Sequence, residues 1–132
     1  MPRKLPQLNQ DNSSFWQEGK QGCLMIHHCS SCQQYFHPPA PICLHCLSED
    51  VGPKKVSGKG SVASFTINYQ KWQPDLDVPF VIAIIELAEQ AGLRFVSNVI
   101  DINPDDVFID MPVTVTFEQH EDIWLPLFRK EA

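Results

Sequence analysis

The sequence lacks any apolar run long enough to cross a membrane. Its longest apolar segment, Phe80 to Ile85, has the length of a core strand, whereas a membrane-spanning helix needs about 20 apolar residues. The first residues, Met1 to Leu5, also lack the apolar centre of a secretory signal. We therefore expect no membrane contact and a cytoplasmic location, where cysteine thiols stay reduced.

Basic residues are scarce as well. The chain has 10 Lys and Arg against 16 Asp and Glu, a formal net charge of −6. Nucleic-acid-binding proteins usually present a basic face that displaces counterions from phosphates. The one local basic stretch consists of Lys54, Lys55, Lys59 and Lys71. This stretch is either solvated or contacts the phosphates of a small ligand, and nucleic acid is an unlikely partner.

The sequence shows no clear catalytic pair. Cys23 has His27 and His28 nearby, and Glu86 ends an apolar strand, but a packed thiol and a solvated acid are the simpler interpretations. The acidic cluster of Asp101, Asp105, Asp106 and Asp110 lacks the spaced alternation of a calcium-binding loop. We therefore do not expect a free-standing enzyme.

Four cysteines carry the strongest signal. Cys29, Cys32, Cys43 and Cys46 follow the pattern C-x2-C-x10-C-x2-C. Each C-x2-C pair can direct two thiolates at one ion, and four thiolates give the closed tetrahedral shell of a structural Zn²⁺ site. The ligand set alone also permits iron, as in rubredoxin.

Two histidines flank these knuckles without being needed as ligands. His37 follows the first knuckle and His45 lies inside the second. Because four cysteines already complete a tetrahedral shell, we expect both histidines to play supporting or surface roles.

The rest of the chain predicts a mainly β fold. A helix is expected from Asn12, with Ser13 or Ser14 as its cap, and a strand from Leu24 to His28. Prolines favour an extended loop between the knuckles. Five further strands are expected within Ser57–Trp72, Phe80–Leu87, Leu93–Ile100, Met111–Phe117 and Ile123–Phe128.

Individual residues predict further features of these strands and the order of the modules. The apolar run Phe80–Leu87 predicts burial on both faces, and Pro126 places the last strand at a sheet edge. Asn103 and Pro104 predict a helix start before the fourth strand. The order suits an N-terminal arm and helix over 1–23, a rubredoxin-like zinc ribbon over 24–53, and a five-stranded barrel of the OB type over 54–132.

Aromatic residues offer two binding hypotheses. Phe65, Tyr69 and Trp72 lie on the first long strand, where OB-folds of nucleic-acid proteins stack bases. This is the basis of the alternative function, a single-stranded nucleic-acid-binding protein. Phe15 and Trp16, on the short helix, either pack on their own domain or dock on a partner subunit.

Taken together, these motifs resemble the DUF35 family of acyl-CoA-associated OB-fold proteins. The resemblance spans roughly residues 12 to 120 and includes Phe15-Trp16, both cysteine pairs, the prolines between them, Gly58-x-Gly60-x-Val62, Pro79-Phe80 and Met111-Pro112-Val113. Two departures stand at turns: Gln33 and Asp110 occupy positions where the family often has glycine.

The resemblance implies an accessory role. Members of this family pair with thiolase-superfamily enzymes, help to shape the channel for the CoA ester, and leave catalysis to the partner. We therefore expect a non-catalytic subunit that binds acyl-CoA together with a thiolase-like partner in lipid, steroid or aromatic side-chain metabolism. Lys54, Lys55 and Lys59 are the candidate phosphate contacts, and Phe15 and Trp16 the candidate docking residues.

Overall fold

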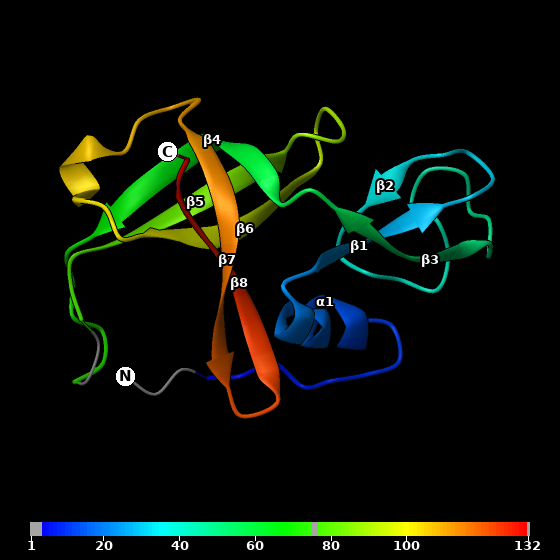
Figure 1. The fold of residues 1–132 in the computed structure, drawn as a ribbon, viewed down its shortest axis with the longest axis horizontal. Helices are drawn as coiled ribbons and strands as arrows, with labels where there is room; N and C mark the ends of the chain where they lie inside the picture. Colours follow the sequence, from blue (N-terminus) through cyan, green and yellow to red (C-terminus); the bar gives the residue numbers. More distant parts are fainter. Residues whose placement is uncertain (1–3, 75–76, 132) are drawn as a thin grey trace.

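The computed structural model describes residues 4–74 and 77–131, which form two β modules with a short N-terminal helix packed against both (Figure 1). The first module is a three-stranded sheet with strand order β2-β1-β3, and the second is a closed barrel with strand order β4-β5-β6-β8-β7. The expected fold class, a zinc ribbon followed by a five-stranded barrel, is confirmed.

The N-terminal segment forms a helix in two parts. The helix α1 (Ser13–Gln17) continues into a 3₁₀ turn, η1 (Glu18–Gln21). Asn12, rather than Ser13 or Ser14, is the N-cap residue, and its side chain makes no capping hydrogen bond. Gly22 ends the turn with φ of 75°, a left-handed conformation that glycine adopts without strain.

The ribbon sheet is built on strand β1 (Leu24–Cys29). This strand pairs with β2 (Tyr35–Phe36) on one side and with β3 (Val51–Val56) on the other. Lys54 and Lys55, expected at the start of the barrel, therefore lie in a strand of the ribbon sheet, opposite Ile26 and Met25.

The barrel strands follow the expected order. They are β4 (Lys59–Asn68), β5 (Phe80–Leu87), β6 (Arg94–Ile100), β7 (Pro112–His120) and β8 (Ile123–Lys130), with a single 3₁₀ turn, η2 (Pro104–Asp106), before β7. The side chain of Asn103 caps this turn by accepting a hydrogen bond from the backbone N–H of Asp105 at 3.0 Å. None of the helices in the described part of the chain is long and apolar enough to span a membrane.

The barrel closes through a short run of pairing between β6 and β8. These parallel strands pair only at Val99–Phe128 and Ile100–Arg129, whereas β7 and β8 pair along eight positions. Toward Arg94 the two strands no longer pair, and the hydroxyl of Ser97 donates a 2.7 Å hydrogen bond to the carbonyl of Pro126 across the gap. We call this unpaired stretch the seam.

The seam explains why Pro126 is tolerated. The expectation of an edge strand was wrong, because β8 lies between β6 and β7 in a closed barrel. Proline lacks a backbone N–H, and at Pro126 the strand has not yet paired with β6, so no ladder bond to that strand is lost.

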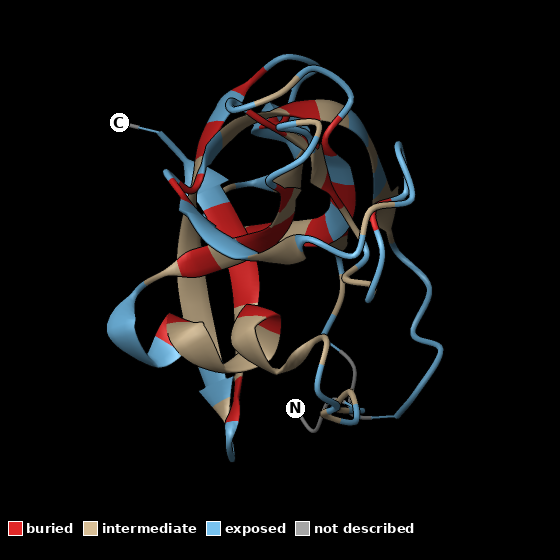
Figure 2. Cartoon of the chain, turned by 90° about the vertical axis from the view of Figure 1, so that its right-hand side faces the viewer, coloured by how far each residue is buried: buried red, intermediate tan, exposed pale blue. Residues whose placement is uncertain are grey.

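Burial of β5 is one-sided, contrary to the expectation of burial on both faces. Val81, Ala83, Ile85 and Leu87 point into the core, while Ile84 on the other face is 38% exposed. The alternation follows from antiparallel pairing with β4 and β6, which leaves one face of the sheet toward solvent. Figure 2 shows buried positions alternating with less buried ones along the barrel strands.

The helix completes the barrel core. Phe15 is 4% exposed and belongs to the same apolar cluster as Phe95 and Phe128. Leu24 and Ile26 of the ribbon sheet also join this cluster. Cys29 and Cys43 instead form a separate small core with Phe36, so the surroundings of the metal site are distinct from the barrel core.

Candidate functional site

The four cysteines converge as their spacing predicts. Their sulfur atoms all lie within 4.8 Å of one another, and the Cys29–Cys46 and Cys32–Cys43 pairs are each 3.6 Å apart. Four thiolates about 2.3 Å from a central zinc are separated by a little under 4 Å in a tetrahedron. The sulfur arrangement therefore fits one zinc ion bound by four thiolates.

Backbone amides stabilise thiolate at the second knuckle. The N–H groups of His45 and Cys46 point at Sγ of Cys43, at 3.3 and 3.4 Å. Burial alone would raise the pKa of the Cys43 thiol, but these donors lower it to about 6. Thiolates are the form that binds metal, and a four-thiolate shell leaves no position for substrate, so the zinc has a structural role.

Neither neighbouring histidine joins the shell. Nε2 of His45 lies 3.2 Å from the carbonyl oxygen of Tyr35, and His37 packs against Phe15 on the side of the barrel. Within the described residues, the four cysteines form the one group of three or more His, Cys, Asp or Glu with metal-ligand geometry. The acidic residues Asp101, Asp105, Asp106 and Asp110 are not brought together as ligands.

The three candidate lysines are not gathered on one face. Lys54 and Lys55 are consecutive in β3 and therefore project to opposite sides of the sheet. The ammonium of Lys54 lies 5.8 Å from the ring centroid of Tyr35. Lys59 begins β4, and its ammonium lies 3.7 Å from a carboxylate oxygen of Glu131.

The two candidate docking residues behave differently. Phe15 is buried in the barrel core, which agrees with the alternative that its ring packs on its own domain, and its docking on a partner stays a prediction. Trp16 is only half-buried. Its ring meets that of Phe15 edge-on, with centroids 4.8 Å apart, and Trp16 remains a candidate for contact with a partner.

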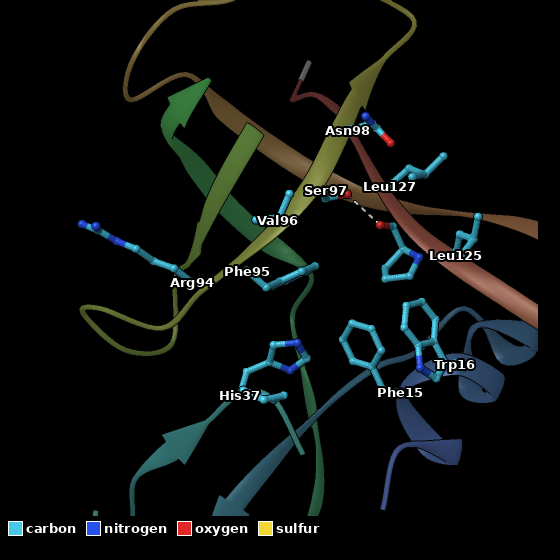
Figure 3. Close-up of a pocket in the computed structure, with 12 residues that line it drawn as sticks. Phe15, Trp16, His37, Arg94, Phe95, Val96, Ser97, Asn98, Leu125 and Leu127 are labelled. Carbon is cyan, nitrogen blue, oxygen red and sulfur yellow. Dashed lines mark hydrogen bonds between the residues drawn. The ribbon is translucent and has the colours of Figure 1, made fainter. Parts of the chain in front are cut away.

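A cavity of about 390 Å³ lies over the seam (Figure 3). Phe15 and Trp16 of the helix form one wall, strands β6 and β8 form the others, and His37 of the ribbon closes one end. Sequence reasoning missed this cavity because its walls come from three separate parts of the chain.

His37 has an unusual environment in this cavity wall. Its ring lies against Phe15 and Phe95, with centroids 4.8 and 5.4 Å away, and its Nδ1 is buried without a hydrogen-bond partner among the described residues. Burial, reinforced by the nearby His27, lowers the pKa of His37 to about 4. The imidazole is therefore neutral at physiological pH.

The other candidates have simpler explanations. The guanidinium of Arg94 donates a 2.7 Å hydrogen bond to Glu86, which lowers the pKa of that carboxyl. Phe65 packs against the barrel core, whereas Tyr69 and Trp72 follow the end of β4 and are largely exposed. The three rings therefore do not lie on one strand, as the base-stacking hypothesis requires.

The exposed apolar side chains gather in part at the second knuckle. Ile42, Leu44 and Leu47 surround Cys43 and Cys46 in the sequence, and Leu47 is 70% exposed. We call these three residues the knuckle patch. Elsewhere, Phe108 and Ile109 are exposed ahead of β7.

Two family models match most of the chain. The rubredoxin-like zinc ribbon domain of ChsH2 matches residues 16–52, and the C-terminal OB-fold domain of ChsH2 matches residues 54–118. These matches agree with the two modules of the structure, the cysteine cluster and the closed barrel.

Similar proteins extend the comparison. A probable enoyl-CoA hydratase alpha subunit from Thermomonospora curvata is 37% identical over 128 residues, which are 96% of this chain and 40% of that protein. A DUF35 domain-containing scaffold protein from Methanocaldococcus jannaschii is 33% identical over 99 residues, 74% of this chain and 69% of that protein. The chain thus spans less than half the length of the hydratase subunit.

One solved structure is similar over nearly the whole chain. It is described as an Ltp2-ChsH2(DUF35) aldolase, is 38% identical, and superposes with a TM-score of 0.82 over 96% of this chain and 98% of that chain. With both of its modules matched by models of the same architecture and relatives at this level of identity, the chain belongs to the DUF35 family, as a ChsH2-type protein with a rubredoxin-like zinc ribbon and an OB-fold.

Proposed function

We propose that this chain is a non-catalytic accessory subunit that binds a thiolase-like enzyme and contributes to the binding of that enzyme's acyl-CoA substrate. The similarity to the chain of the Ltp2-ChsH2(DUF35) aldolase carries this proposal, because the likeness covers nearly the full length of both chains. A shared surface over that length favours a shared kind of partner.

The accessory role rests on chemistry as well as on similarity. The metal has four thiolate ligands and a structural role, so it does not activate substrate. A similar archaeal protein is named a scaffold. The relative named as a hydratase subunit is matched over only 40% of its length, and its activity does not have to reside in the part that this chain resembles.

Exposed apolar residues supply a surface for the partner. The knuckle patch lies beside the zinc site, which holds its backbone rigidly. Trp16 stands half-buried at the cavity mouth. Exposed apolar patches often mark sites of protein–protein contact, and tryptophan is enriched among the energetically dominant residues of interfaces.

Contact with the CoA phosphates is assigned to the basic residues of β3 and β4. Lys54 and Lys55 project to opposite faces of the sheet, so they do not contact the same phosphate. One of the two therefore contributes most of the affinity for acyl-CoA. Lys59 already pairs with Glu131 at the surface, where such pairs are weak enough to exchange for a phosphate.

No specific observation favours the nucleic-acid alternative. The formal net charge is −6, and Phe65 is turned toward the barrel core rather than presented for stacking. A base-stacking surface needs aromatic rings beside a basic groove.

The decisive experiment is purification of the tagged chain from its own host at moderate salt. Recovery of a thiolase-superfamily protein in near-equal amount supports the proposal, and a preparation without such a protein contradicts it. Leu47→Glu, which charges the knuckle patch, should weaken the complex, while Tyr69→Ala serves as an exposed control on another loop.

The acyl-CoA part has its own test. In the purified complex, acyl-CoA affinity is measured for Lys54→Glu, Lys55→Glu and Lys59→Glu, with Lys20→Glu in the 3₁₀ turn η1 as the control. Loss of affinity in one of the two β3 variants, but not in the control, supports the contact. Equal affinity in all four variants removes the lysines from the site while leaving the partner assignment intact.

A further inference from the structure

The cavity over the seam has the features of a ligand site rather than of a packing defect. Its volume of about 390 Å³ falls in the range of small-molecule pockets, which reach from about 300 to 1,000 Å³. Such pockets combine apolar walls with a few polar groups that fix the orientation of the ligand.

The walls of this cavity favour a ring or a branched apolar group. Phe15 and Trp16 contribute aromatic surface from the helix and Phe95 contributes it from β6, while Leu125 and Leu127 contribute aliphatic surface from β8. Figure 3 shows the rings of Phe15 and Trp16 side by side beneath β8, with Phe95 and His37 facing them. Aromatic walls of this kind bind planar and alicyclic groups through broad contact area.

The polar groups of the cavity favour a neutral ligand. Arg94 lies at the rim, where its side chain extends away from the rings of the cavity (Figure 3) and its Nε donates a hydrogen bond to Glu86, and the hydroxyl of Ser97 donates a hydrogen bond to the carbonyl of Pro126. The imidazole of His37 is neutral and has a buried nitrogen without a protein partner. Buried polar groups normally have a partner, so an exception in a native fold calls for one from outside the chain.

The position of His37 allows it to meet such a ligand. Its ring lies between Phe15 and Phe95 at one end of the cavity. Rotation about the Cβ–Cγ bond exchanges the edges of the imidazole, and this terminal torsion is broad in proteins. A hydroxyl on the ligand can either donate to or accept from the neutral ring.

We propose that the seam cavity binds a small neutral molecule, or the neutral end of a larger one, that carries a ring or branched apolar body and one hydroxyl or carbonyl group directed at His37. This site belongs to the chain itself and does not depend on the proposed partner. The same chemistry can come from a free metabolite or from the end of a bound acyl group.

The test uses the full zinc-loaded chain and three simple probes of similar size. These are 4-methylphenol, which has a ring and a hydroxyl, toluene, which lacks the hydroxyl, and benzoate, which is charged. Binding is followed by two-dimensional amide NMR. We expect 4-methylphenol to shift the amides of residues 94–98 and 125–127 and to bind more tightly than toluene by about three- to tenfold, the factor of one hydrogen bond, while benzoate binds weakest.

Two variants distinguish the contribution of the hydrogen bond to His37 from that of the apolar cavity walls. His37→Phe keeps a neutral aromatic ring and should reduce 4-methylphenol binding to the level of toluene without changing toluene binding. Leu125→Trp fills the cavity and should abolish binding of both, and Trp72→Ala, on the exposed loop after β4, is the remote control. Comparison of the probes on the unmodified chain keeps the test decisive if a variant fails to fold.

Three results would overturn the assignment: shifts confined to other surfaces, equal affinity for 4-methylphenol and toluene, or tighter binding of benzoate. The source of the ligand is then tested in the partner complex with an acyl-CoA whose acyl group ends in a ring. Shifts of the same amides place the end of the acyl group in the cavity, and their absence, together with retained 4-methylphenol binding, indicates a free metabolite.

Discussion

The ring of Phe15 meets the ring of Phe95 edge-on, with centroids 5.8 Å apart and planes at 85°. These residues come from the N-terminal helix and from β6, and their contact closes the part of the barrel where β6 and β8 do not pair. The helix is therefore part of the barrel core rather than an appendage.

Replacing Phe15 by Ala should destabilise the barrel strongly. The ring is almost fully buried, and truncation of a buried phenylalanine costs about 3–5 kcal/mol through lost transfer energy and a cavity. Urea unfolding followed by circular dichroism measures the change. The matched control is Trp72→Ala, since Trp72 is 72% exposed and its loss should change the free energy of unfolding by no more than about 0.5 kcal/mol. Equal costs for the two variants would contradict a core role for Phe15.

Asp110→Gly should leave the protein as stable or stabilise it. Asp110 has φ of 68°, a left-handed conformation that costs a residue with a side chain about 1 kcal/mol relative to glycine. Asp106→Gly is the control, because Asp106 is an exposed aspartate of the same connection, within the turn Pro104–Asp106, and glycine there should cost up to about 1 kcal/mol. The unfolding temperatures of both variants measure the change. A larger decrease for Asp110→Gly than for Asp106→Gly would contradict backbone strain at Asp110.

Stability should fall with acid partly through His37. The pKa of His37 is lowered to about 4 in the folded state, below its ordinary value of about 6.5. The unfolded chain therefore binds a proton more readily, and the contribution of the neutral residue is complete above pH 6.5 and lost as the pH falls toward 4. The loss attributable to His37 is at most about 3 kcal/mol over this range.

The measurement is the free energy of unfolding of the protein and of His37→Phe at several pH values between 7 and 4. Zinc thiolates also take up protons in acid, but they are common to both proteins, so the difference isolates His37. Parallel curves for the two proteins would show that His37 does not titrate in this way.

Replacing Cys29 or Cys43 by Ser should remove the zinc and unfold the ribbon. The two residues are buried in the small core with Phe36, and a structural zinc contributes about 10–16 kcal/mol to the folding of such a module. Zinc content and hydrogen exchange of the ribbon amides report the result. Cys23→Ser is the control, because Cys23 lies outside the group of four sulfurs. Zinc at full occupancy in the first two variants would show that the ligands are assigned wrongly.

The sequence predicts best where one local pattern decides the structure. The spacing of Cys29 and Cys32 sets the first knuckle without help from distant residues, and the turn residues Glu89-Gln90-Ala91-Gly92 between two apolar segments predict the hairpin of β5 and β6. The residues also predict the order of the two modules, with the ribbon before the barrel, and the family models confirm it.

What the sequence does not reveal depends on distant contacts. The apolar run of β5 gives no sign that Ile84 faces solvent, because pairing and packing decide which face is covered. Nothing near Phe15 indicates that its ring fills the seam, since its neighbour Phe95 lies far along the chain. The cavity beside His37 is not predicted from the sequence for the same reason.

The contact of the first helix with the last strand has a consequence for how the chain folds. A helix of five residues is too short to persist alone, and its packing surface on β8 is completed only at the other end of the sequence. On a ribosome the zinc knuckles can form before β8 is synthesised, whereas the N-terminal segment has to wait for that strand. Contacts between such distant residues slow folding, so docking of the N-terminal helix should follow the formation of β8.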